Sequence, residues 1–103
     1  ANAERLSEQV LKLAQLGPQP VQWVCCDLVA VDDVDYSAAA TLHEVISELN
    51  AKGIRLVFSS TSAHVRSEVD ASGITELVGE DAFYLDLVAV SEAYQKWTES
   101  ARP

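Results

Sequence analysis

Hydrophobic residues recur along this chain with two different spacings, and segments with the two spacings alternate. Residues 3–16 carry apolar side chains at intervals of three and four, which predicts an amphipathic helix. Gly17, Pro18 and Pro20 follow and end it. The next run, VQWVCCDLVAV, is almost entirely apolar and rich in β-branched side chains, which is typical of a strand covered on both faces.

The remainder of the chain continues this alternation. A second helix is expected over about 37–51, where Leu42, Val45, Ile46 and Leu49 share one face and Gly53 is placed to end it. The run IRLVFSS predicts a second buried strand, and a weaker helix is expected over about 63–71, ended by Ser72-Gly73. A third short strand near 82–85 and a final helix from Leu87 complete the order.

Alternation of this kind predicts an α/β fold, with a mainly parallel sheet flanked by about four helices and joined by right-handed crossovers. Its length of 103 residues suits one domain, 1–103. Because three strands are few for four helices, and the chain contains no methionine, we expect one or two strands to precede Ala1 in a longer polypeptide. The domain is therefore predicted to be truncated at its N-terminus.

Charge narrows the classes of partner. Sixteen acidic residues face seven basic ones, giving a formal charge of −9, and the basic residues are scattered singly. Nucleic acid and anionic lipid attract clustered positive charge, so neither is an expected partner. No run approaches the roughly 18 apolar residues that cross a bilayer, so direct membrane insertion is not expected either.

The two cysteines, Cys25 and Cys26, are neighbours inside the first predicted strand. Adjacent strand residues point to opposite faces, so a disulfide between them or a shared metal ion is improbable. Buried free thiols are the expected state.

Three aspartates stand in the stretch VDDVDYSAAATLHEV, directly before the second predicted helix. A metal site is not expected there, because the stretch lacks the glycine of a calcium loop and its nearest histidine, His43, stands eight residues beyond Asp35. Asp35 or Ser37 can accept hydrogen bonds from the unpaired N–H groups of the first turn. Capping explains these residue types, but not why three acids are present.

Catalysis and nucleotide hydrolysis have little support. No G-x-S-x-G elbow surrounds Ser37, and neither glycine-rich phosphate motif occurs, so the protein is not expected to be an enzyme. A weaker phosphate site could form at SSTSAHVR, where hydroxyl groups and an arginine meet a helix N-terminus at the carboxyl end of a strand. A polar turn that only caps the helix is the alternative. The candidate residues there are Ser59, Ser60, Thr61, Ser62, His64 and Arg66.

The order of these pieces resembles the STAS domain, named from sulfate transporters and anti-sigma factor antagonists. The matching pieces are CCDLVAVDDVDYSAAATLHEV, AKGIRLVFSS, VRSEVDASGI and GEDAFYLDLVAVSEAY, which cover about residues 21–95. The opening ANAERLSEQVLKL is similar to the segment that follows the second strand in STAS domains of SulP-type anion transporters. The resemblance thus implies the STAS fold and a cytoplasmic C-terminal domain of a SulP-like sulfate transporter, partnered by that transporter's transmembrane core.

The resemblance also implies roles for particular residues. Asp33, Asp35, Tyr36 and Ser37 would form a partner-facing lip, with the segment Ser59 to His64 as its neighbour. A guanine nucleotide, GTP or GDP, would be a weak ligand, and no cofactor would be required. The alternative within the family is the antagonist branch, a free-standing anti-sigma factor antagonist that is switched by phosphorylation of the serine corresponding to Ser37. Tyr36 and Ala38 depart from that branch's Asp-Ser-Ser-Gly-like turn, which favours the transporter branch.

Overall fold

The computed structural model describes residues 22–101, and the helix expected over residues 3–16 lies outside that range. The elements in chain order are β1 (Trp23–Asp27), α2 (Tyr36–Ala51), β2 (Arg55–Ser59), α3 (Ala63–Ala71), α4 (Ile74–Val78), the 3₁₀ turn η1 (Glu80–Ala82), β3 (Phe83–Tyr84) and α5 (Leu87–Ala101). The alternation predicted from sequence is confirmed over these residues.

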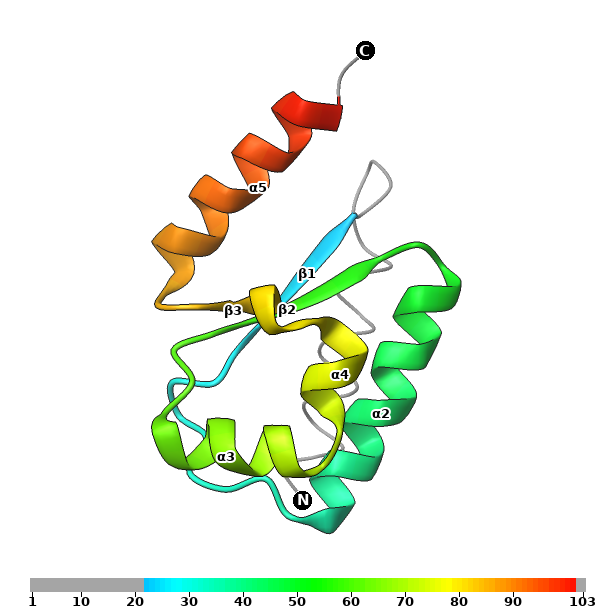
Figure 1. The fold of residues 1–103 in the computed structure, drawn as a ribbon, viewed down its shortest axis with the longest axis vertical. Helices are drawn as coiled ribbons and strands as arrows, with labels where there is room; N and C mark the ends of the chain where they lie inside the picture. Colours follow the sequence, from blue (N-terminus) through cyan, green and yellow to red (C-terminus); the bar gives the residue numbers. More distant parts are fainter. Residues whose placement is uncertain (1–21, 102–103) are drawn as a thin grey trace.

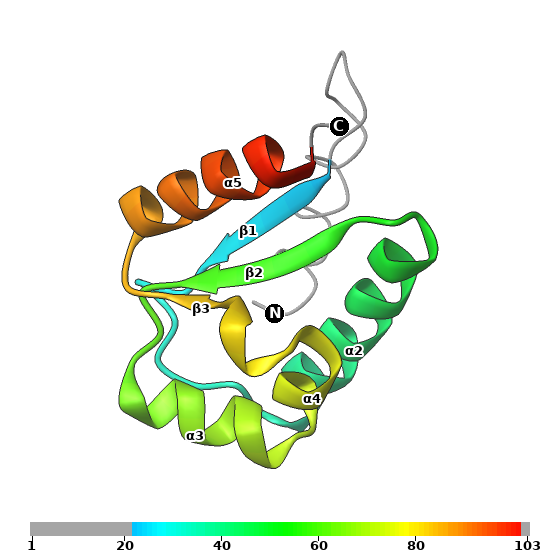
Figure 2. The same cartoon turned by 45° about the horizontal axis from the view of Figure 1, so that its top comes forward.

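The three strands form a parallel sheet in the order β1-β2-β3. Asp27 pairs with Ser59, and Ser59 pairs with Tyr84, so the carboxyl ends of all three strands meet at one edge. Helices α2, α3 and α4 lie on one side of this sheet and α5 lies on the other (Figure 1, Figure 2). This is the α/β arrangement that the sequence predicted. Of the described helices, α2, α3 and α5 correspond to predicted ones.

One core lies between the sheet and α2. The residues of α2 that share its apolar face are buried: Ala39, Leu42, Val45, Ile46 and Leu49. They join Leu56 and Phe58 of β2 and Val24 and Cys26 of β1 in one hydrophobic cluster. The helical spacing read from the sequence therefore identified the packed face correctly.

The opposite face of the sheet is covered by α5 through aromatic side chains. The ring of Trp23 lies 5.4 Å from that of Tyr94 and 5.6 Å from that of Trp97. The guanidinium of Arg55 sits over the same Trp23 ring at 5.1 Å. Trp23 and Cys25 thus face α5 while Val24 and Cys26 face the core, as strand alternation requires.

The first strand is shorter than its apolar run. β1 ends at Asp27, because the Asp27 carboxylate accepts a hydrogen bond from the N–H of Val29 and a turn follows. Leu28 stays buried, but Val29 is 72% exposed. The predicted extension of this strand to Val31 was wrong, since hydrophobicity alone does not show where the chain leaves a sheet.

The region after α3 holds two elements that the sequence did not predict, α4 and η1. Gly73 ends α3 as expected, with a left-handed φ of 84°, but the chain re-enters a helix at Ile74. Ile74 and Thr75 are buried in this short helix. Among the helices of residues 22–101, none has the length and apolar content needed to cross a membrane.

Candidate functional site

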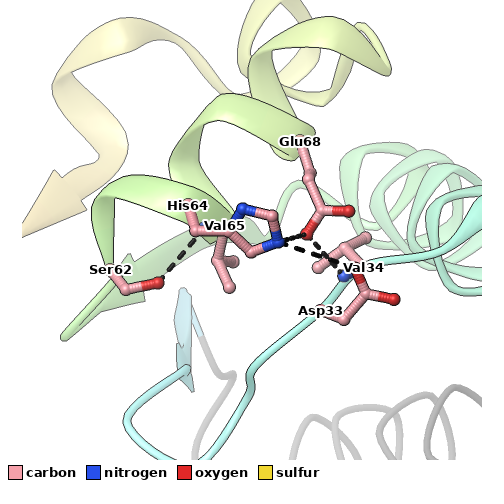
Figure 3. A network of polar contacts seen from close by, with 6 residues as sticks. All are labelled: Asp33, Val34, Ser62, His64, Val65 and Glu68. Carbon is pink, nitrogen blue, oxygen red and sulfur yellow. Dashed lines mark hydrogen bonds and ion pairs between the residues drawn. The ribbon is translucent and has the colours of Figure 1, made fainter.

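The candidate site lies where β1 and β2 end. Two loops leave this edge of the sheet: residues 28–35 lead into α2, and residues 60–62 lead into α3. Side chains from both loops and from the first turns of α3 approach one another there (Figure 3). Loops at the carboxyl ends of parallel strands are where ligands usually bind in open α/β sheets.

Asp35 caps helix α2. Its backbone is extended, and its Oδ1 accepts a hydrogen bond from the N–H of Ala38 at 2.8 Å. Of the two capping residues considered from sequence, Asp35 is therefore the one that caps. Ser37 is exposed, and Tyr36 is 89% exposed at the first position of the helix. The cap holds the start of α2 in place while the Tyr36 ring projects into solvent.

Asp33 serves a different purpose: it reaches across to α3. The Nε2 atom of His64 lies 3.8 Å from Oδ1 of Asp33 and 3.2 Å from Oε1 of Glu68. The N–H of Val34 donates to the same Glu68 oxygen at 3.0 Å. One aspartate thus caps a helix and another contacts the neighbouring helix, which explains two of the three acids. Asp32 is exposed.

The pKa values of the two carboxyl groups in this cluster, Asp33 and Glu68, are shifted in opposite directions. A hydrogen bond with Glu68 raises the pKa of Asp33, and the nearby negative charges of Glu68 and Asp35 raise it further. The N–H of Val34 lowers the pKa of Glu68, and the hydrogen bond with Asp33 lowers it further. Within this pair Asp33 is therefore the weaker acid and Glu68 the stronger one.

Ser59 is not at the surface of the site. It is fully buried, accepts a hydrogen bond from the Cys25 thiol at 3.4 Å and donates one to Oδ1 of Asp27 at 3.2 Å. Its hydroxyl links the ends of β1 and β2 and is not presented to a ligand. The sequence placed it at the correct edge of the sheet but could not show its burial.

The other hydroxyl residues mainly shape the loop before α3. Ser62 caps α3 by accepting from the N–H of Val65 at 3.2 Å. Ser60 adopts a positive φ of 56°, and its hydroxyl lies 3.5 Å from the carbonyl of Leu85. The hydroxyl oxygen of Thr61 is buried and has no hydrogen-bond partner among the described residues. Ser62 therefore caps the helix, as the turn-and-cap alternative expected of this segment.

Arg66 is engaged by other groups. Its Nε donates to Oδ1 of Asp70 at 2.9 Å, and its guanidinium lies 3.8 Å above the Phe83 ring. An anion at this edge would have to compete with Asp70 for the charge. The structure therefore brings Asp33 and His64 together. Tyr36 and Ser37 are exposed a few residues after Asp33 in the chain. The charge of Arg66 is directed to Asp70 and the Phe83 ring.

Sequence reasoning missed Glu68 and Asp27. Glu68 follows His64 by four positions, and this spacing places two side chains on the same helix face. That signal was available once 63–71 was predicted to be helical. Asp27 was hidden inside an apolar run, and only strand pairing brings it to Ser59.

Comparison with known proteins identifies the family. The sequence model of the STAS domain matches residues 1–90. A probable sulfate transporter of Mycobacterium tuberculosis is 24% identical over 96 residues, which are 93% of this chain and 17% of that protein. Sulfate transporter 3.2 of Arabidopsis thaliana is 26% identical over 98 residues, which are 95% of this chain and 15% of that protein. The chain thus spans a small part of the curated relatives it matches.

Solved structures agree in fold. The STAS domain of a SulP transporter from Vibrio cholerae superposes with a TM-score of 0.74 at 25% identity, covering 95% of this chain and 74% of that one. A sulfate transporter family protein from Wolinella succinogenes has a TM-score of 0.80 at 14% identity, covering 93% of this chain and 79% of that one. With most of its length matched by the family's sequence model, this chain belongs to the STAS domain family.

Proposed function

We propose that this chain is a non-catalytic regulatory and interaction domain of a membrane sulfate or anion transporter. The observation that carries the proposal is the alignment of nearly the whole chain with only 15% to 17% of the length of sulfate transporters. A domain that occupies so small a part of a transporter is suited to controlling the transmembrane core rather than to forming the path of the ion. The proposed location is the cytoplasmic side of the cell membrane.

The surface proposed to meet the partner is the lip formed by Asp33, Asp35, Tyr36 and Ser37. Tyrosine side chains in interfaces often contribute much of the binding energy, because a large rigid ring loses little conformational entropy when it is buried. Tyr36 is 89% exposed, and the Asp35 cap holds the helix that carries it. The transmembrane core of the same protein is the proposed partner, and a separate regulatory protein could use the same surface.

The first test is the reading frame upstream of Ala1. We expect it to encode a long series of apolar helices, each of roughly 20 residues, because a transporter core must span the bilayer many times. A short upstream region without such helices would contradict the transporter assignment.

The second test is ion uptake by the full-length protein carrying Tyr36→Ala. We expect uptake, or its response to regulation, to change at an equal amount of protein in the membrane. Tyr36→Phe keeps the ring, so its uptake should stay close to that of the unaltered protein. Glu76→Gln changes an exposed residue of α4 and serves as a control. Identical uptake by all three variants would contradict a role for the lip.

A weak guanine-nucleotide ligand is a further part of the proposal. Its support is the family resemblance, together with the position of the two loops at the carboxyl edge of a parallel sheet. Titration with GTP and GDP, followed by backbone amide shifts, should move signals of residues 32–37 and 59–66, with ATP as the comparison. No clustered shifts at millimolar nucleotide would remove this part and leave the interaction role standing.

A free-standing antagonist switched by phosphorylation is the second candidate. The observation that favours it is the exposure of Ser37 in the first turn of α2, where the helix dipole stabilises a phosphate. The nearby carboxylates of Asp33 and Asp35 would repel that phosphate. The relatives named above are transporters, which favours the first candidate. Phosphorylation of Ser37 by a partner kinase, with loss of partner binding, would support the second.

A further inference from the structure

We propose that Asp33, His64 and Glu68 form a binding site for a divalent cation of the zinc type. Each residue supplies one ligand atom, and the three atoms lie within 4.8 Å of one another. Figure 3 shows the His64 ring directed at the carboxylates of Asp33 and Glu68. This inference goes beyond the proposed function, because it stands whether or not the domain belongs to a transporter.

The distances between the ligand atoms fit a small tetrahedral ion. Zinc bonds to nitrogen and oxygen are about 2.0–2.1 Å long, so two ligand atoms on one tetrahedral ion are about 3.3 Å apart. His64 Nε2 lies 3.2 Å from Glu68 Oε1 and 3.8 Å from Asp33 Oδ1. A small rotation of the Asp33 side chain would complete the geometry.

The backbone around the three ligands is already arranged. His64 and Glu68 are one turn apart on α3, whose start is capped by Ser62. The N–H of Val34 holds the Glu68 carboxylate at 3.0 Å, in the manner of the outer hydrogen bonds that orient metal ligands. The Val34 side chain is buried, which anchors the loop carrying Asp33. Little reordering is needed for binding.

The ligand set selects the kind of ion. One imidazole nitrogen with two carboxylates suits zinc and its transition-metal neighbours, whereas magnesium and calcium prefer oxygen ligands alone. The exposed position of Asp33 and His64 leaves room for water as the remaining ligand. A cation would also relieve the repulsion between two adjacent carboxylates on a chain of formal charge −9.

The proposed site differs from the sequence-based expectation that no metal site would form. That expectation rested on the distance along the chain between the aspartates and any histidine. The fold removes that distance, because the loop before α2 lies against α3 and Asp33 meets His64.

Calorimetric titration of the chain with zinc chloride is the first experiment. We expect one zinc ion per chain, and no comparable heat with magnesium chloride. His64→Gln and Glu68→Gln should each weaken zinc binding roughly tenfold or more, since even outer partners of ligands contribute that much. The amide oxygen introduced by Glu68→Gln can still accept from the N–H of Val34, so the loop contact is kept. The control Glu76→Gln removes an equal charge on α4 and should bind like the unaltered chain.

The position of the ion is the second measurement. Zinc should shift the NMR signals of Asp33, His64 and Glu68 and leave those of His43 in place, because His43 Nε2 already contacts the carbonyl of Ser72 at 2.8 Å. Cobalt in place of zinc should show no thiolate-to-cobalt absorption, which separates this site from Cys25. Unchanged affinity in His64→Gln, a thiolate band, or shifts centred on His43 would each overturn the proposal.

Discussion

The backbone N–H of Val34 donates a hydrogen bond to Oε1 of Glu68 at 3.0 Å, across a sequence separation of 34 residues. This contact ties the loop before α2 to the second turn of α3. Val34 is buried beside it, so the loop is held both by its side chain and by its backbone. We expect the position of Asp33, and with it the shape of the proposed lip, to depend on this tie.

Replacing Glu68 tests the tie. Glu68→Ala removes the acceptor, so the Val34 amide should exchange its hydrogen with solvent faster, and the signals of residues 32–35 should broaden or shift. Glu68→Gln keeps an acceptor oxygen and should behave much more like the unaltered chain. Equal protection of the Val34 amide in all three proteins would show that the loop is held without Glu68.

The Asp35 cap can be tested by its effect on stability. Asp35→Ala leaves the N–H of Ala38 without its side-chain acceptor and should lower the free energy of unfolding by about 0.5–2 kcal/mol. Asp35→Ser retains a capping oxygen without the charge and should recover most of that loss. Urea denaturation followed by circular dichroism measures both. If Asp35→Ser lowered the free energy of unfolding as much as Asp35→Ala, the charge and not the capping oxygen would matter at this position.

A substitution in the core between α2 and the sheet should lower the free energy of unfolding more than loss of the Asp35 cap does. Leu49 is completely buried, so Leu49→Ala should lower the free energy of unfolding by about 2–5 kcal/mol through lost burial and a residual cavity. Val88→Ala, at a position 65% exposed on α5, should change it by about 0.5 kcal/mol or less. Similar losses in the two variants would contradict the described core.

The two thiols should be unreactive in the folded protein. Burial raises the pKa of the Cys26 thiol to about 12, and burial also raises the pKa of Cys25. At pH 8 both thiols are therefore protonated, whereas the thiolate is the form that reacts with alkylating reagents.

Alkylation with iodoacetamide at pH 8 measures this difference. Both cysteines should react slowly in the native chain and quickly in denaturant, and the Cys25→Ser variant assigns the two rates. Because Cys25 is only half-buried, its native rate should exceed that of Cys26. Rapid reaction of one native thiol at pH 8 would contradict the raised pKa of that group.

Much of the fold was predictable because burial leaves a periodic trace in sequence. The face of α2 that carries Leu42, Val45, Ile46 and Leu49 was identified from spacing alone, and those residues are buried. The ends of α3 were also predicted, since Ser62 caps its start and Gly73 follows its end. By contrast, α4 has five residues, too few to show a period, although its Ile74 is buried.

The sequence predicted the location of the candidate site better than it predicted which side chains the site exposes. Strand order along the chain correctly put the aspartates and the serine-rich loop at one edge of the sheet. Which groups turn outward was not predictable: Ser59 is fully buried, while Tyr36 is 89% exposed. Exposure depends on what packs above a residue, and a sequence pattern does not contain that information.

The sequence by itself determined the α/β class, the packed face of α2 and the family, because periodic burial and ordered motifs are local properties of the chain. Tertiary structure alone decided the meeting of Asp33 with His64 and Glu68, and the placement of the Arg66 guanidinium over the Phe83 ring. The physical reason is that side-chain contacts between loops depend on how two crossover connections return to the same sheet edge. That geometry exists only once the parallel strands have paired.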